Sequence, residues 1–407
     1  MKKSWISKPL ADLCEVFTDG NWIESKDQSP KGIRLIQTGN VGQGVFKDRG
    51  EKARYISEAT FKRLRCTEIF EGDCLVSRLP DPVGRSCILP DTGERMITAV
   101  DCSILRFTKQ QMLPTFFNFY SQSLDYLKAV DDVTTGTTRN RISRSNLGSV
   151  PIPIPPLAEQ QRIVGLLDDT FEGIATAKAN AEKNLQNARA LFESHLQSVF
   201  FHRGKGWVEE PLESVSAIIN GFAFKSTDFS AKAGLKCIKI TNVGVREFVA
   251  ESGPFLPSNF AVKHRAFTVT EGNIVIALTR TIIAGGLKVA VVPAEYDGAL
   301  LNQRVASIIA NHHVVDGKFL FAFLSTQTVV DYVKGRVNTL MQPNLSIADL
   351  RSLPIPLPPL SEQIKITNQI DALREETQRL ATLYTRKLAA LEALKKSLLH
   401  QAFSGEL

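Results

Sequence analysis

Two proline-free stretches of the chain place apolar side chains at alternating intervals of four and three residues. The first follows Pro156, and its positions are Leu167, Phe171, Ile174, Ala181, Leu185, Ala188, Phe192 and Val199, with Lys178 and His195 as polar exceptions. The second follows Pro359, and its positions are Ile370, Leu373, Thr377, Leu380, Tyr384, Leu391, Leu394 and Leu398. This 3.5-residue period is typical of a coiled-coil seam. It predicts two long helices that pair with each other, antiparallel if their domains lie at opposite ends.

A pair of core helices inside an ordinary α domain is the alternative interpretation of these stretches. The absence of proline, the length and the matching register all favour a rod. A helix of 40–45 residues would be roughly 60–68 Å long at the standard rise. We therefore expect rods that separate globular domains.

The segments that precede the two stretches have a mixed pattern. Short β-rich runs, bounded by Gly, Pro or Asp, predict strands at 33–37, 74–77, 274–278 and 288–292. Helical periodicity predicts a helix over 115–130 and a counterpart over 318–333. The fold class expected is α+β, with mixed α/β domains that each lead into a long helix.

The chain is an internal duplication. VPIPIPPLAEQ at 150–160 recurs as LPIPLPPLSEQ at 353–363, and IQTGNVG at 36–42 recurs as IKITNVG at 238–244. GDCLVSR, ending at Arg78, aligns with GNIVIALTR, ending at Arg280, after one small gap. A repeat of about 200 residues is a whole domain with a following element, since solenoid repeats are far shorter. The halves differ strongly outside these matches, which suggests two modules that do the same task on different targets.

The duplication predicts four segments. A first domain occupies 1–156 and its helix 157–205, and a second domain occupies 206–359 and its helix 360–407. The Pro-Pro-Leu-x-Glu-Gln elements join each domain to its helix, because proline stiffens the joint and cannot enter a helix interior. Glu159 and Glu362 then lie in a first helical turn, where a negative charge suits the helix dipole.

Composition is that of an ordinary globular protein, with 43% hydrophobic and 22% charged residues among 407. We find no apolar run near the roughly 20 residues that a membrane span needs, and no signal peptide. The six cysteines form no CxxC pair. We expect reduced thiols, mostly in the core, and a cytoplasmic protein. A net charge of +7 permits a polyanionic partner without establishing one.

Catalytic signatures are missing from the sequence. We find no GxxxxGK[ST] phosphate loop, no glycine-rich nucleotide or S-adenosylmethionine fingerprint, and no Asn-Pro-Pro-aromatic motif of adenine methyltransferases. His312-His313 near Asp316 is better interpreted as a surface loop than as a metal site. The stretch 90–95 is better interpreted as a loop than as a nuclease acidic cluster, because the expected lysine is missing. We expect no enzyme activity, no cofactor and no metal on this chain.

The repeated Pro-Ile-Pro-(Ile/Leu)-Pro-Pro-Leu-(Ala/Ser)-Glu-Gln element followed by a long helix resembles the specificity (S) subunits of Type I restriction–modification systems. The resemblance covers essentially the full chain. The stretch 137–143 before the first element also resembles the family, whereas its counterpart at 340–346 matches more loosely. The halves then correspond to two target-recognition domains, each followed by a conserved helix.

The resemblance implies a non-catalytic subunit that binds double-stranded DNA and directs two methyltransferase (M) subunits to a bipartite site. It leaves open a restriction (R) subunit that hydrolyses ATP and cuts DNA. S-adenosylmethionine and Mg-ATP would be bound by those partners. Three alternatives remain at this point: a stand-alone DNA-binding regulator or architectural protein, a coiled-coil scaffold that never touches DNA, and a recognition arm of another restriction type.

Base reading needs side chains with paired donors and acceptors, with Arg or Lys for guanine and Asn or Gln for adenine. The first domain offers Gln37, Asn40, Lys47, Arg49, Arg78, Arg139, Asn140, Arg141 and Arg144. The second offers Lys239, Asn242, Arg246, Arg280, Gln303, Arg304, Arg336 and Asn338. The cluster 139–144 is the strongest candidate, and the apparent equivalence of Arg78 and Arg280 suits phosphate anchoring. For Trp5 and Trp207 we expect packing rather than base stacking.

Overall fold

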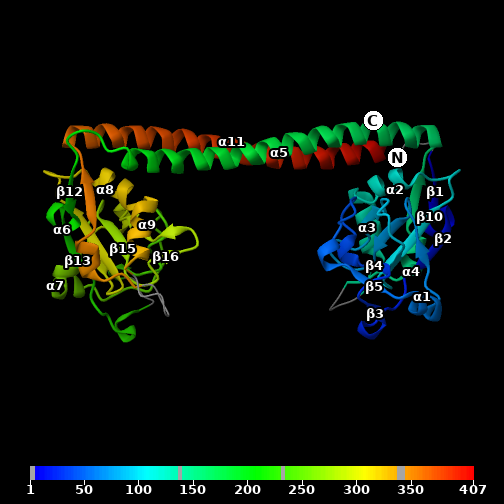
Figure 1. Ribbon diagram of the computed structural model, residues 1–407, viewed down its shortest axis with the longest axis horizontal. Helices are drawn as coiled ribbons and strands as arrows, with labels where there is room; N and C mark the ends of the chain where they lie inside the picture. The colour runs from blue at the N-terminus through cyan, green and yellow to red at the C-terminus, as the bar shows by residue number, and fades with distance from the viewer. Residues whose placement is uncertain (1–4, 136–139, 231–233, 337–343) are drawn as a thin grey trace. The chain divides into compact units, whose positions relative to one another are not determined.

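The computed structural model describes residues 5–135, 140–230, 234–336 and 344–407. The chain divides into two compact units. Unit 1 comprises Met1–Glu182 and Thr385–Leu407, and unit 2 comprises Lys183–Tyr384. Each unit holds one α/β domain together with about half of each of two long helices (Figure 1).

The domain of unit 1 contains two larger sheets. The four-stranded antiparallel sheet has the order β2 (Cys14–Asp19), β10 (Cys102–Phe107), β7 (Cys74–Ser77), β8 (Ser86–Ile88). The five-stranded sheet has the order β3 (Gln28–Ser29), β5 (Arg54–Ile56), β4 (Ile33–Ile36), β9 (Met96–Thr98), β6 (Glu68–Ile69), with β4 and β9 parallel. A separate two-stranded sheet pairs β1 (Ile6–Pro9) with β11 (Pro151–Ile154). The helices are α1 (Glu58–Leu64), α2 (Pro114–Tyr120), α3 (Leu124–Asp132) and α4 (Arg144–Ser149).

Unit 2 repeats the four-stranded sheet and the terminal pair. The sheet order is β13 (Ser216–Asn220), β20 (Val305–Ala310), β15 (Ile274–Ala277), β18 (Val289–Val291), and β12 (Val208–Pro211) pairs with β21 (Pro354–Leu357). Shorter pairs are β14 (Cys237–Ile238) with β19 (Leu300–Leu301), and β16 (Ile282–Ile283) with β17 (Gly286–Leu287). The helices are α6 (Leu212–Val215), α7 (Phe260–Lys263), α8 (Gly317–Leu324), α9 (Gln327–Lys334) and α10 (Ile347–Arg351). The expected α+β class with two tandem domains is confirmed.

The four predicted strands are present, but each predicted domain helix is broken into two. The segment 115–130 forms α2 and α3, and the segment 318–333 forms α8 and α9. The break in unit 1 lies at Ser123, whose side chain caps α3 by accepting a hydrogen bond from the Tyr126 amide. In unit 2, the hydroxyl of Thr326 donates to the Phe323 carbonyl over 2.7 Å. Hydroxyl side chains that bond to nearby backbone end a helix in this way.

Each domain core runs from the sheet into the long helices. In unit 1, Phe116 and Phe117 of α2 are fully buried between the sheet and the long helices. Trp5 packs edge-on against Phe116, with ring centroids 6.5 Å apart, and Trp207 packs against Phe319 at 6.1 Å. The predicted packing role of the two tryptophans is confirmed. The six cysteines are free, and five of them are buried.

The long helices α5 (Leu157–Phe201) and α11 (Leu360–Ser404) have 45 residues each. In unit 1 the beginning of α5 shares a hydrophobic core with the end of α11, where Ile163 and Leu167 join Leu399 and Phe403. In unit 2 the end of α5 shares a core with the beginning of α11. The helices therefore pair antiparallel, as predicted. Across the described stretches, none of the helices combines the length and apolar character needed to cross a membrane.

One predicted seam position is wrong. Leu394 is 46% exposed, and the half-buried Lys395 takes its place, with its ammonium 4.8 Å from the centre of the Phe171 ring. The step from Leu391 to Lys395 keeps the alternation of three and four residues that the helix pair requires. A lysine is tolerated there because its stem lies on apolar surface while its ammonium stays near water.

The glutamine of each Pro-Pro-Leu-x-Glu-Gln element ties the domain to its helix. The Gln160 side chain is fully buried, accepts from the Leu113 amide and donates to the Gln111 and Pro155 carbonyls, each over 2.9 Å. Gln363 makes the same three bonds, with the Asp316 amide and with the Val314 and Pro358 carbonyls. Glu159 and Glu362 lie in the first turns as predicted. The sequence pattern attributes the joint to proline and glutamate, whereas the structure adds the buried glutamine, a contribution that the pattern does not indicate.

Candidate nucleic-acid interface

The two domains share one backbone arrangement at the end of the four-stranded sheet where β10 and β20 begin. In unit 1 the chain leaves β2 and crosses the turn that precedes β10, and in unit 2 it leaves β13 and crosses the turn that precedes β20. We call residues 19–22, 78, 98–102 and 141–144 the first edge. Residues 220–222, 278–280, 301–305 and 344 form the second edge.

A glycine permits the crossing in each edge. The Gly20 amide donates to the Cys102 carbonyl over 2.9 Å, and the Gly221 amide donates to the Val305 carbonyl over 3.2 Å. A Cβ at Gly20 would lie 2.2 Å from the Thr98 carbonyl oxygen, and one at Gly221 would lie 2.1 Å from that of Asn302. Any other residue would force the crossing strands apart.

Backbone hydrogen bonds define which residues of the two edges are equivalent. The Arg78 amide donates to the Asp101 carbonyl, and the Leu278 amide donates to the Arg304 carbonyl, both over 2.9 Å. Asp101 and Arg304 therefore occupy the same framework position, and Arg78 corresponds to Leu278. The predicted equivalence of Arg78 and Arg280 is wrong, because the strands align without the gap that the sequence comparison introduced.

Arg78 itself supports the first edge from inside. It is 5% exposed, donates to the Val100 carbonyl over 2.6 Å and lies 3.3 Å from Asp19. Burial lowers the pKa of Arg78, and the nearby guanidinium groups of Arg141 and Arg144 lower it further. A guanidinium held in this way is not available for a phosphate, so its predicted anchoring role is replaced by a structural one.

The described candidates of the cluster 139–144 are at the surface. Arg141 is exposed and lies 2.8 Å from the carboxylate of Asp101, and Asn140 and Arg144 are exposed. Arg139 lies outside the described residues. The first edge therefore exposes Arg141 and Arg144, while the third arginine, Arg78, lies buried beneath them.

The second edge presents three of the predicted residues. Arg280, Gln303 and Arg304 are exposed. Lys288 lies near Arg280: burial lowers its pKa, and the Arg280 charge lowers it further. Arg336 is exposed at the end of α9, where its guanidinium stacks on the Tyr332 ring at 3.6 Å and lies 4.0 Å from Asp349. Asn338 lies outside the described residues.

Asn40 and Asn242 are corrections to the predicted set. Both are buried, and both hold a tight loop. The Asn242 side chain accepts from the Lys239 amide and donates to the Val249 carbonyl, each over 2.8 Å, and Asn40 bonds in the same way to the Gln37 amide and the Lys47 carbonyl. The paired donor and acceptor that would suit adenine are used to close the loop.

The other candidates lie on or next to these loops. Lys47 and Arg49 are exposed. Lys239 lies 2.7 Å from Glu251 and is half-buried. Arg246 is turned toward α5, where it forms a bidentate ion pair with Glu193 and donates to the Ser325 carbonyl over 2.6 Å. That pairing replaces the predicted base contact of Arg246, while Gln37, partly exposed, contributes its backbone amide to the loop.

Two aromatic residues at the edges were missed. Trp22, one residue after the crossing in unit 1, is 68% exposed, and Phe222 in unit 2 is 36% exposed with its ring 4.4 Å from that of His264. Phe222 directly follows a Gly that is preceded by Asn, and Trp22 lies two residues after a Gly that is preceded by Asp, so this signal could have identified both.

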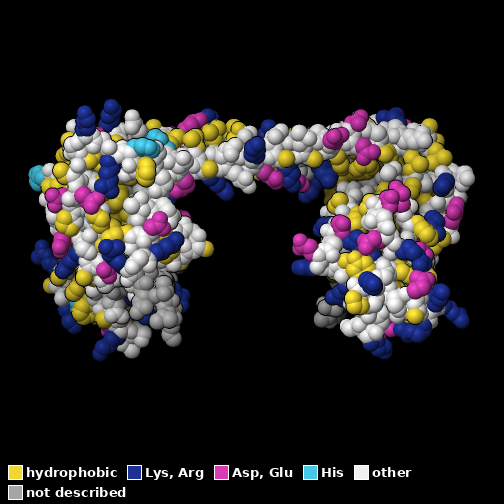
Figure 2. Space-filling model, viewed as in Figure 1, with side chains coloured by type: hydrophobic (Ala, Val, Ile, Leu, Met, Phe, Trp, Pro, Cys, Tyr) yellow, Lys and Arg dark blue, Asp and Glu magenta, His cyan; other side chains and the backbone are white. Residues whose placement is uncertain are grey.

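Charge is spread widely over the domains. On the face drawn in Figure 2, Lys and Arg lie over the end of each domain away from the helices, mixed with Asp and Glu. Among the described residues, no group of three or more His, Cys, Asp or Glu side chains is placed to hold a metal ion.

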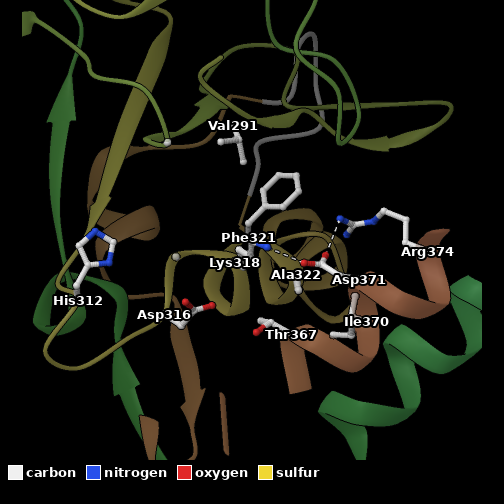
Figure 3. Close-up of a pocket in the computed structure, with 12 residues that line it drawn as sticks. Val291, His312, Asp316, Lys318, Phe321, Ala322, Thr367, Ile370, Asp371 and Arg374 are labelled. Carbon is white, nitrogen blue, oxygen red and sulfur yellow. Dashed lines mark hydrogen bonds and ion pairs between the residues drawn. The ribbon is translucent and has the colours of Figure 1, made fainter. Parts of the chain in front are cut away.

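A cavity of about 510 Å³ in unit 2 lies between α8 and the first turns of α11 (Figure 3). Its two cations face one carboxylate, with Lys318 at 2.8 Å and Arg374 at 3.3 Å from Asp371. In unit 1 the corresponding space holds Phe119 and Phe171, which pack edge-to-face with ring centroids 5.5 Å apart. The neutralised cations make this cavity a poor site for a polyanion.

Comparison with known proteins identifies a family model that matches both halves. The Type I restriction modification DNA specificity domain matches residues 2–186 and 204–387. The Type I restriction enzyme MjaVIII specificity subunit of Methanocaldococcus jannaschii is 27% identical over 316 residues, which cover 74% of this chain and 72% of that protein. The Type I restriction enzyme EcoAI specificity subunit of Escherichia coli is 30% identical over 181 residues, covering 44% and 30%.

Two solved structures share the fold over the whole chain. A chain from work on complex assembly and conformational transition of the type I R-M system has a TM-score of 0.78 at 17% identity, covering 100% of this chain and 99% of that one. The HsdS subunit from Thermoanaerobacter tengcongensis has a TM-score of 0.66 at 18% identity, covering 100% and 98%. At these identities the likeness shows the fold alone.

Proposed function

The chain belongs to the Type I restriction modification DNA specificity family, and from this membership we propose that it reads a bipartite DNA site on behalf of a DNA adenine methyltransferase. Each domain reads one half-site, and the chain positions two methyltransferase subunits, with or without a restriction subunit, on the DNA. The chain acts in the cytoplasm and performs no catalysis itself.

The observation that carries the proposal is the pair of edges with one backbone and different side chains. Position 101 is Asp in the first edge, and the equivalent position 304 is Arg in the second. A shared framework with altered donors and acceptors is what two readers of different half-sites need. Similar frameworks also give two copies of one partner near-equivalent surfaces to bind.

The outward faces of the long helices support the docking of partner subunits. Five exposed leucine or isoleucine side chains lie along them: Leu166, Leu191, Ile364, Leu383 and Leu394. Contiguous apolar patches mark protein partners, whereas single exposed leucines are ordinary on a surface, so the docking of partner subunits rests mainly on family membership. S-adenosylmethionine and Mg-ATP would be bound by these partners. Flipping the target adenine out of the helix costs a few kcal/mol, which binding to two half-sites helps to offset.

Comparing adenine methylation in the source cell with and without this gene tests the proposal. We expect methylation to disappear at one split motif, two short specified blocks around a fixed gap. A stand-alone regulator, the alternative, predicts an unchanged methylation map and specific DNA binding by the purified chain alone. An unchanged map together with failure to co-purify with a methyltransferase subunit would reject the proposal.

A further inference from the structure

We propose that Arg141, held by Asp101, and Arg304, which takes the place of Asp101, are the side chains that each read a guanine in the two half-sites. This inference rests on the proposed function and specifies its chemistry. It divides the exposed candidates into base readers at the two edges and phosphate contacts on the loops that carry Lys47 and Arg49.

The position of both residues in the fold is the first argument. Asp101 and Arg304 directly precede β10 and β20, which have six residues each and are therefore about 20 Å long. The segments that follow these strands are held by Gln160 and Gln363 at the starts of the long helices. The two residues thus lie at the strand ends remote from the helices, on turns whose backbone is held by several hydrogen bonds.

The chemistry of the first edge is the second argument. The Arg141 Nη2 atom lies 2.8 Å from Asp101 Oδ1, while the Arg141 side chain stays 45% exposed. An acidic group beside a guanidinium disfavours contact with DNA phosphates, while the exposed part of the guanidinium can still donate to neutral acceptors. Guanine presents two acceptors, O6 and N7, to such a pair of donors in the major groove. The Asp101–Arg141 pair is therefore suited to a base rather than to the backbone.

The second edge also presents guanidinium N–H donors, but from a residue at a different framework position. Arg304 occupies the framework position of Asp101, and no described side chain pairs with its guanidinium. The turn that carries it is stiffened by Asn302, whose side-chain oxygen lies 3.4 Å from the Arg304 amide. The two guanidinium groups start from different segments of the edges, Arg141 from the segment after residue 140 and Arg304 from the turn before β20.

The test replaces Arg304 with Ala in the full chain, expressed with its methyltransferase partner, and maps methylated motifs by long-read sequencing. We expect one G·C position in one half-site to become degenerate while the other half-site is unchanged. Discrimination against other bases at that position should fall about 5- to 150-fold. The logarithmic salt slope of DNA binding should stay the same, because a phosphate contact would reduce it by about 1. Arg141→Ala should relax the other half-site, and Asp101→Asn should do so more weakly.

Two matched controls accompany these variants. Arg351→Ala and Lys109→Ala each remove an exposed cation outside the edges, and both should leave the motif unchanged. Arg304→Gln keeps a polar side chain, so it guards against a folding defect and should relax the same position. Unchanged discrimination in the Arg304 and Arg141 variants, or uniform weakening with a smaller salt slope, overturns the inference while the proposed function stands. If the unaltered protein directs methylation to no split motif, the proposed function fails first.

Discussion

At the residue scale, side chains with base-reading chemistry divide into those that face outward and those that serve the fold. Asn242 closes a loop, Arg78 lies under an edge, and Arg246 is paired with Glu193. Arg304 and Arg141 remain exposed on held turns. Residue type is therefore a weak guide to function here, since Arg and Asn bond as well to backbone carbonyls as to bases.

The loop role of Asn242 predicts a loss of stability when its amide is removed. Asn242→Ala leaves the Lys239 amide and the Val249 carbonyl without their partner in a buried position. We expect the free energy of unfolding of unit 2 to fall by about 1–3 kcal/mol. Urea unfolding followed by circular dichroism measures this. Gln303→Ala, at an exposed residue, serves as the control, and equal effects of the two variants would contradict the loop role.

At the element scale, each long helix has two packing roles, and the spacing of its apolar residues does not by itself distinguish them. One side of each helix forms the pairing seam, and parts of the same helices complete the domain cores, as Phe403 does in unit 1. Leu399 is 5% exposed, whereas Leu394, five residues earlier, is 46% exposed. Two leucines within two turns thus have different environments, because only one faces the core.

This difference in burial predicts that replacing the two leucines with alanine has unequal effects on stability. Leu399→Ala should lower the free energy of unfolding of unit 1 by about 2–5 kcal/mol, since it opens a cavity in a packed core. Leu394→Ala should change it by no more than about 0.5 kcal/mol, as surface substitutions usually do. Thermal unfolding of both variants beside the unaltered chain checks this. A large effect of Leu394→Ala would restore the original seam assignment.

At the scale of the whole molecule, duplication supplies two readers, and the helices connect them. Both helices have 45 residues, and each runs from one unit into the other. The proposed function makes helix length the determinant of the unread spacer between the half-sites. Changes in the helices should then alter the gap of the methylated motif without altering its specified bases.

A matched insertion tests this dependence. Seven residues added between Glu182 and Lys183, and seven between Tyr384 and Thr385, preserve the seam period in both helices. Each helix lengthens by about 10.5 Å, so the spacer should grow by about 3 base pairs at 3.4 Å per base pair. Methylation mapping reads the spacer and the half-sites together. Insertion in α5 alone disrupts pairing and should abolish methylation, and altered half-site bases in the matched variant would argue against independent modules.

The amino-acid sequence alone was enough to predict the features that depend on periodicity and repetition. Local sequence patterns determine the two long helices and the short strands, and the repeated segments reveal the duplication. The family resemblance follows from the repeated proline element. The breaks at Ser123 and Thr326 were missed because a single hydroxyl that bonds to backbone leaves the helical period nearly unchanged.

The candidate site depended on contacts between residues far apart in the chain. Arg78 and Arg280 were matched by an alignment gap, whereas strand register pairs Arg78 with Leu278 and Asp101 with Arg304. Whether an arginine faces solvent or a buried carbonyl is set by the segments that fold against it, as Asp19 and Val100 do at Arg78. Sequence can list groups able to bind DNA, but packing and strand register select those that are presented to it.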